Sequence, residues 1–244
     1  NSIACANIML NTAVAESLKI YADRLEGVAD FETALHDMIK KTIKDHKRII
    51  FNGNGYDDSW IKEATEKRGL CNYRTTADCM PHILDEKNVR MLTSHKVFSE
   101  VELKSRYEIM LENYCKTVMI EACTMVDMAK KQILPAVSAY TTDLAESVGK
   151  KLKLGTDIAC KYEKEAVKKL SILCDKIAEA TDLLEGTLVK IKAAESIGEE
   201  SEMIRDAVLV AMSELRVACD EAETMTAEKY WPFPTYGELL FGVR

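Results

Sequence analysis

The fold is decided by residues 98–134, which read FSEVELKSRYEIMLENYCKTVMIEACTMVDMAKKQIL. Ser99 is a good N-cap residue, and Glu102, three residues later, can complete a capping box. Apolar residues then recur at steps of three and four, which is the spacing of one helical face. They are Leu103, Tyr107, Met110, Tyr114, Val118, Met125 and Met128. We expect one helix from Glu100 to the residue before Pro135, roughly 50 Å long at about 1.5 Å per residue.

A helix of that length needs partners of similar length, and the rest of the chain supplies them. Pro135 suits the first position of a next helix, which would end near Gly149. Apolar spacing predicts another helix over residues 157–191, and Ser196 with Glu199 forms a second capping box that opens a last one. Long helices joined by short turns predict an antiparallel bundle. The residues expected to face inward in the last two helices are Ile158, Tyr162, Ala166, Leu170, Leu173, Ile177, Leu184, Leu188, Ile191, Ile204, Ala207, Val208, Ala211, Leu215, Ala218, Cys219 and Ala222.

Shorter helices and an irregular region precede the long helix. Gly27 can end a first helix, and Asp30 can cap a second. The apolar face of the first helix comprises Leu10, Val14, Leu18, Tyr21 and Leu25. The expected buried face of the second comprises Leu35, Met38, Ile39 and Ile43. Basic residues crowd the C-terminal half of the second helix, where cations suit the helix dipole; a solvated helix end is favoured over an anion site. They are Lys40, Lys41, Lys44, His46, Lys47 and Arg48.

Composition narrows the range of functions. The 244 residues include 33 basic and 40 acidic side chains, for a net charge of −7, and no stretch collects enough cations for a nucleic-acid surface. The longest apolar runs are far shorter than the roughly 20 residues that cross a bilayer, and no signal peptide pattern is present. The eight cysteines show no Cys-x-x-Cys pair, and most fall within helical patterns. They indicate small buried apolar residues in a reducing compartment, so we expect a cytoplasmic protein.

Two stretches of the irregular region could hold a ligand. Asn52-Gly53-Asn54-Gly55 predicts a tight loop with backbone at positive φ, and glycines could also let backbone N–H groups approach a phosphate. The P-loop spacing with its Lys-Ser/Thr pair is absent, which favours the plain turn. A zinc site is the other possibility, and its ligands would be Cys71, Cys79, His82 and His95. Their spacing matches no compact zinc module, so packing is the favoured interpretation.

The chain closes with an aromatic and proline-rich tail at residues 230–244. Aromatic anchors serve either a tail that folds back on its own bundle or one that docks into a neighbouring subunit. We expect this tail to be docked and leave both destinations open. The interface candidates are Trp231, Phe233, Tyr236, Leu240 and Phe241.

Several motifs resemble the later part of type III glutamine synthetase. They are Asn52-Gly-Asn-Gly-Tyr-Asp-Asp-Ser-Trp60, Arg68-Gly-Leu, Thr75-Thr-Ala-Asp78, Ser94-His-Lys-Val97, Glu102-Leu-Lys-Ser-Arg-Tyr-Glu-Ile109 and Trp231-Pro-Phe-Pro-Thr-Tyr-Gly237. The resemblance runs over residues 1–139 and returns at the tail, and the motifs keep their order and spacing. The chain therefore looks like the later part of something longer.

The resemblance implies a cytoplasmic enzyme that ligates ammonia to glutamate with ATP and Mg or Mn, assembled as a homo-oligomeric ring. It also implies that the catalytic and metal-binding residues lie on a β-rich core outside this chain. No catalytic, cofactor-binding or metal-binding residue is therefore assigned here. The expected partners are the remainder of the synthetase and its neighbouring subunits, with no nucleic acid and no membrane.

The expected architecture is mainly α: a long antiparallel bundle preceded by shorter helices and loops, with an aromatic tail. Residues 1–96 form the end of a catalytic-domain-like region, residues 97–229 the bundle and residues 230–244 the docking tail. The leading hypothesis is a scaffold segment that is inactive alone. A free-standing helical module whose tail binds a partner protein is the alternative, and a small metalloenzyme that uses the four cysteines and histidines above is a third.

Overall fold

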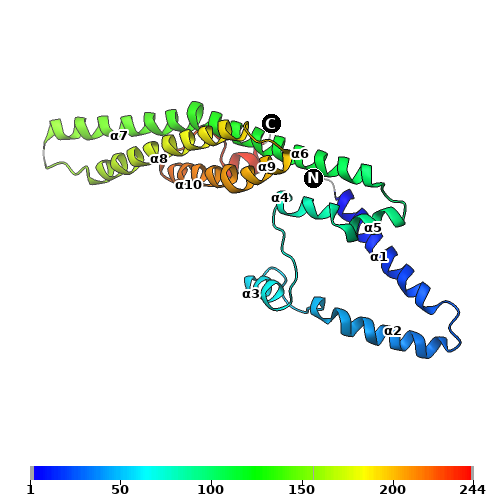
Figure 1. Cartoon of the computed structure of the whole chain (residues 1–244). Coiled ribbons are helices and arrows are strands. Elements are labelled where there is room, and N and C mark those ends of the chain that lie inside the picture. Colours follow the sequence, from blue (N-terminus) through cyan, green and yellow to red (C-terminus); the bar gives the residue numbers. More distant parts are fainter. Residues whose placement is uncertain (1–2, 156, 243–244) are drawn as a thin grey trace. The chain divides into compact units, whose positions relative to one another are not determined.

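The computed structural model describes residues 3–155 and 157–242, and every regular element within them is a helix (Figure 1). The chain divides into two compact units, Asn1–Met110 and Leu111–Arg244. Helix α6, Glu100–Met128, begins in the first unit and ends in the second. The predicted mainly α fold is confirmed.

The second unit is a bundle of long helices in which α8 is the central member. The elements after α6 are η4 (Ala129–Ile133), α7 (Leu134–Leu154), α8 (Lys161–Ile191), α9 (Ile197–Met203), η5 (Ile204–Val208), α10 (Leu209–Met225) and α11 (Tyr236–Phe241). Figure 1 shows α8 running beside α7, with α10 on its other side. The predicted bundle is confirmed.

Ion pairs between neighbouring helices show that α7 and α8 are antiparallel. Lys130 Nζ lies 2.5 Å from Glu185, towards the end of α8. Farther along the chain, Lys151 pairs with Glu163, at the start of α8. An exposed ion pair such as Lys130–Glu185 contributes at most about 1 kcal/mol. The stability of the bundle therefore comes mainly from its apolar core.

The core follows an 11-residue period. In the part of the helical run from α6 to α7 that lies in the second unit, the buried residues are Leu111, Cys115, Val118, Ala122, Val126, Ala129, Ile133 and Val137. In α8 they are Ala166, Leu170, Leu173, Ile177, Thr181, Leu184, Leu188 and Ile191. Eleven residues make about three turns, so residues such as Leu111, Ala122 and Ile133 occupy equivalent places on the helix. This period favours right-handed coiling, unlike the seven-residue repeat of ordinary coiled coils.

The predicted stripe on α6 is correct in its face but off by one residue at four positions. Met110, Tyr114, Met125 and Met128 are half-buried, and the residue that follows each of them is buried instead. The predicted residues therefore flank the buried face of α6 at these four positions.

Helical conformation runs unbroken from Glu100 to Leu154, so the prediction that a helix ends before Pro135 is wrong. Instead, η4 is a π-helical turn, in which the Leu134 N–H donates to the Ala129 carbonyl. In an α-helix, a proline ring clashes with the carbonyl four residues earlier. The wider turn directly before Pro135 lets the helix continue without that clash.

The two predicted capping boxes differ in their completeness. Ser99 Oγ accepts from the Glu102 N–H at 3.3 Å, and the Glu102 carboxylate accepts from the Ser99 N–H at 2.8 Å, which closes the first box. Ser196 Oγ accepts from the Glu199 N–H at 3.2 Å, but the Glu199 carboxylate accepts from the Glu195 N–H at 2.8 Å. The second box is therefore only half formed.

The cysteines are free thiols in varied surroundings. Cys115, Cys160 and Cys219 are buried, as the sequence predicts. Cys174 is half-buried, and Cys123 is exposed on α6 in spite of its helical position. Burial raises the pKa of Cys115 and of Cys219 to about 11 in each case, because the thiolate would lose its hydration.

The first unit consists of shorter helices around a small core. Its elements before α6 are α1 (Ala4–Leu25), α2 (Phe31–His46), η1 (Lys47–Ile49), α3 (Asp58–Lys62), η2 (Glu63–Lys67), α4 (Thr76–Cys79), η3 (Met80–Leu84) and α5 (Glu86–Ser94). Ile83, Leu92 and Leu103 form its buried centre, with Phe98 packed beside them. Gly27 ends α1 with φ +72°, a conformation that favours glycine.

Helix α2 has no buried residue. Asp30 caps it as predicted, accepting from the Thr33 N–H at 3.2 Å. The predicted buried face is wrong for the described part of the chain, because Ile39 is 49% exposed and Ile43 54% exposed. The main contacts of α2 are with α1 and η1, its neighbours along the chain.

Candidate functional site

The four candidate zinc ligands do not come together. His95 Nε2 lies 2.7 Å from the Glu16 carboxylate on α1, and His82 Nδ1 lies 3.0 Å from the Asp85 carboxylate. The His82 ring also stacks on Tyr73, with ring centroids 4.0 Å apart. Among the described residues, no group of three or more His, Cys, Asp or Glu side chains could hold a metal ion. The histidines instead tie segments of the first unit together.

Asn52–Gly55 is an irregular loop, as predicted, but its glycines do not adopt positive φ; in the described chain that conformation occurs only at Gly27, Lys96 and Gly69. The turn is made at Asn54, whose side chain accepts from the Tyr56 N–H at 3.1 Å and whose carbonyl accepts from the Asp57 N–H at 3.3 Å. A side-chain turn and a backbone turn therefore occur together at this residue.

The glycine at position 53 is explained by packing. A Cβ atom there would lie 2.6 Å from the Phe51 ring, which stacks on Trp60 with ring centroids 3.7 Å apart. The loop therefore needs this glycine whether or not a ligand approaches it. Tyr56, which follows the two glycines, is 97% exposed.

Arg68 fixes the base of this loop. Its guanidinium donates to the Glu63 carboxylate, with a shortest distance of 2.6 Å, and to the Ile50 carbonyl at 2.9 Å. It also donates to the Arg48 carbonyl at 3.2 Å and lies 4.9 Å from the Trp60 ring centre. Since these contacts use its donors, Arg68 is a structural clamp rather than a ligand-binding residue.

A basic and apolar groove lies beside this clamp. It has a volume of about 710 Å³ and is lined by Lys40, Ile43, Lys44, Lys47, Arg48, Ile50 and Arg68. Apart from Arg68, none of these cations forms an ion pair with a carboxylate of the described residues. The mixture of unpaired cations and exposed isoleucines fits a protein surface better than a small anion, which needs converging, fixed donors.

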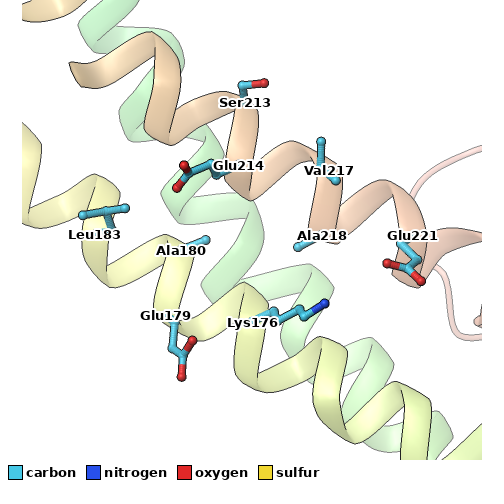
Figure 2. A pocket seen from close by; sticks show the side chains of 9 residues that line it. All are labelled: Lys176, Glu179, Ala180, Leu183, Ser213, Glu214, Val217, Ala218 and Glu221. Carbon is cyan, nitrogen blue, oxygen red and sulfur yellow. The ribbon is translucent and has the colours of Figure 1, made fainter. Parts of the chain in front are cut away.

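Figure 2 shows a second groove, of about 490 Å³, between α8 and α10. Ala180 and Ala218 face each other across it, so the two helices leave space between them. The other lining residues are Lys176, Glu179, Leu183, Ser213, Glu214, Val217 and Glu221. A hydrogen bond from Lys169, 2.9 Å away, lowers the pKa of Glu221. With no histidine or cysteine in its lining, this groove offers neither a Ser-His nor a Cys-His pair for nucleophilic catalysis.

The tail divides into an anchored and an exposed part. Trp231 and Phe233 are half-buried against the core of the second unit, with ring centroids 6.0 Å apart. The other interface candidates lie on α11, where Tyr236 is 83%, Leu240 71% and Phe241 81% exposed. Thr235 and Glu238 close a capping box that starts this helix. The tail is thus anchored at its base while an apolar helix projects from it.

The sequence pattern did not reveal that one apolar face of α1 is exposed. Leu10, Val14 and Leu18 share a face of α1, as predicted, but this face is uncovered. The signal that could have revealed it is the presence of apolar residues on two faces of α1, Ile8 and Met9 on one and Leu10, Val14 and Leu18 on the other, since such a helix needs partners on more than one side.

No helix among the described residues is both long and apolar enough to cross a membrane. Residues 34–152 match the family model of the glutamine synthetase C-terminal domain. The chain is 37% identical over 215 residues to a glutamine synthetase of Butyrivibrio fibrisolvens, covering 88% of this chain and 31% of that protein. It is 32% identical over 241 residues to the type-3 glutamine synthetase of Dictyostelium discoideum, covering 96% and 33% of the two chains.

A glutamine synthetase of Bacteroides fragilis (strain YCH46) is 29% identical over 248 aligned residues, covering 98% of this chain and 34% of that protein. The chain thus spans about a third of the length of the curated relatives that it matches. The matched domain covers the motifs from Asn52 to Ile109 that carry the resemblance. The chain belongs to the type III glutamine synthetase family and contains its C-terminal domain.

Proposed function

We propose that this chain supplies scaffold and subunit contacts to a type III glutamine synthetase. The enzyme would ligate ammonia to glutamate with ATP and Mg or Mn, through residues outside this chain, as a homo-oligomeric ring in the cytoplasm. Phosphoryl transfer to a carboxylate needs metals and cations placed around the developing charge. The acidic residues here lie mostly on solvated helix faces, many in pairs with lysines four residues away, such as Glu112 with Lys116.

The observation that supports this proposal is that the chain matches a glutamine synthetase domain but aligns with only part of each relative. Residues 34–152 match a glutamine synthetase domain, yet the chain spans about a third of each relative. A helical domain with uncovered apolar surfaces in both units, on α11 in one and on α1 and α2 in the other, fits a part of a larger assembly.

The tail is the proposed contact with a neighbouring subunit. Trp231 and Phe233 hold its base on the bundle, and α11 presents Tyr236, Leu240 and Phe241 to the outside. Aromatic and leucine side chains on a short, capped helix are typical anchors for an apolar pocket of another protein. Their exposure in the single chain is therefore expected to end on assembly.

A chimeric enzyme tests the proposal. The part of the Butyrivibrio fibrisolvens synthetase that aligns with this chain is replaced by residues 1–244, and the chimera is expressed in bacteria that lack their own glutamine synthetase. We expect growth without added glutamine, and a purified chimera that forms glutamine and sediments as an oligomer. A soluble, folded chimera that is monomeric and inactive would refute the proposal.

The isolated chain provides the second arm of the test. With ATP, glutamate, ammonium and magnesium, we expect glutamine formation at background, because the metals and substrates need ligands outside the chain. Turnover that follows the chain through a sizing column would contradict this and direct attention to the Asn52–Asp58 loop.

A further inference from the structure

Helix α1 is apolar on two opposite faces. One face packs inside the first unit, where Thr12 is buried and Ile8 and Met9 are half-buried. On the opposite face, Leu10 is 65%, Val14 58% and Leu18 62% exposed. Steps of four residues place these three side chains in one stripe. A helix with apolar residues on two opposite faces needs a cover on more than one side.

Helix α2 also has an exposed apolar stripe, but on one face only. Phe31, Leu35, Ile39 and Ile43 follow one another at steps of four, and three of them are about half exposed. Helices in proteins are stabilised mostly by packing of such a face, yet none of these four residues is buried in the described chain. The exposed stripes of α1 and α2 are called here the α1–α2 face.

Cations edge the α2 part of this face. Lys40, Lys44, Lys47 and Arg48 line the groove beside Ile43, and no carboxylate of the described residues pairs with them. If two copies of the α1–α2 face met around a two-fold axis, cation would meet cation, which costs free energy. The occupant should instead bring an apolar surface with carboxylates at its margin.

We propose that the α1–α2 face is the seam on which the remaining two thirds of the synthetase dock. This rests on the proposed function, and it adds which surface is used and what chemistry meets it. The relatives are about three times as long as the stretch they share with this chain, so a large partner surface is available within the same enzyme. The docking region would be apolar, with Asp or Glu side chains opposite the α2 cations.

The test uses the chimera described above with charges placed in the seam. Val14→Glu with Leu18→Glu interrupts the α1 stripe, and Ile39→Glu with Ile43→Glu interrupts the α2 stripe. Ala15→Glu is the matched control, since Ala15 is exposed on α1 but off the stripe. We expect each double variant to lose glutamine-forming activity by about tenfold or more, because a buried unpaired carboxylate is costly. The control should keep the activity of the unmodified chimera.

The same variants in the isolated chain show whether these side chains stabilise the chain itself or act only where the rest of the synthetase docks. Their midpoints of thermal unfolding should equal that of the unmodified chain, since these side chains are exposed there. A lower midpoint would overturn the proposal, because the stripes would then be covered within the chain. Self-association of the isolated chain that the variants abolish would also overturn it, in favour of a second copy as the occupant.

Three further outcomes keep the proposals distinguishable. Full activity and assembly of both double-variant chimeras would overturn the seam while leaving the proposed function intact. An inactive, folded chimera without any variant would refute the proposed function itself, and the seam with it. Equal losses from Ala15→Glu and from the stripe variants would overturn the seam, because the damage would not follow the stripe.

Discussion

Truncation of Ile177 to alanine should destabilise the second unit strongly. Ile177 is 0% exposed in the middle of α8, the helix that contacts both α7 and α10. Removing three carbons from such a site costs about 2–5 kcal/mol, and the rigid helices on both sides leave little room for the cavity to collapse. For a chain of this size, about 3 kcal/mol corresponds to a fall of roughly 6–12 °C in the midpoint of thermal unfolding.

The assay is thermal and urea unfolding of the isolated chain, followed by far-ultraviolet circular dichroism. Ile172→Ala is the matched control, because Ile172 lies on the same helix and is 48% exposed. We expect the control to change the free energy of unfolding by no more than about 0.5 kcal/mol. Ile177→Val should fall between, at about 0.5–1.5 kcal/mol. Equal effects of Ile172→Ala and Ile177→Ala would refute the inference that α8 is central to the bundle.

Three further predictions follow from the contacts of single side chains. At pH 8, iodoacetamide should modify Cys123 rapidly but Cys115 and Cys219 only after unfolding, because burial raises the pKa of both thiols to about 11; mass spectrometry before and after urea checks this. Hydrogen bonds from Ser99 lower the pKa of Glu102, so their stabilisation is present at neutral pH and is lost as pH falls through that lowered pKa. Glu102→Gln should therefore weaken the acid dependence of unfolding, measured from pH 7 to pH 3. Arg68→Ala should speed hydrogen exchange across residues 48–68, and Arg68→Lys should not restore protection, since lysine lacks the planar fork.

The bundle was predictable because its signals are local and repeated. Apolar residues at steps of three and four mark the faces, and Asp30, Ser99 and Ser196 mark helix starts that the structure confirms. The prediction failed at Pro135 because a rule about proline in an α-helix does not include the π-turn that avoids the clash. That turn depends on packing of the whole helix, which local pattern does not contain.

The candidate sites were less predictable, since they depend on which segments meet. Sequence could group Cys71, Cys79, His82 and His95 only by residue type. The structure gives the two histidines carboxylate partners, Asp85 and Glu16, and the second of these lies 79 residues from its histidine. Likewise, the sequence shows Arg68 only as part of a motif and does not show what it binds. In the structure it donates to two carbonyls 18 and 20 residues earlier, which makes it a clamp.

Helices α8 and α1 both carry apolar residues at helical spacing, but only in α8 are most of these residues buried. A stripe at helical spacing says that a face is meant to be covered, but not by what. In α8 the covering helices lie in the same chain, and Leu170 and Leu184 are 0% exposed. In α1 the same spacing leaves Leu10 and Leu18 more than half exposed. Since the spacing is helical in both cases, it does not distinguish a face covered within the chain from one left exposed; if the rest of the synthetase docks as proposed, the uncovered stripe on α1 marks where it would bind.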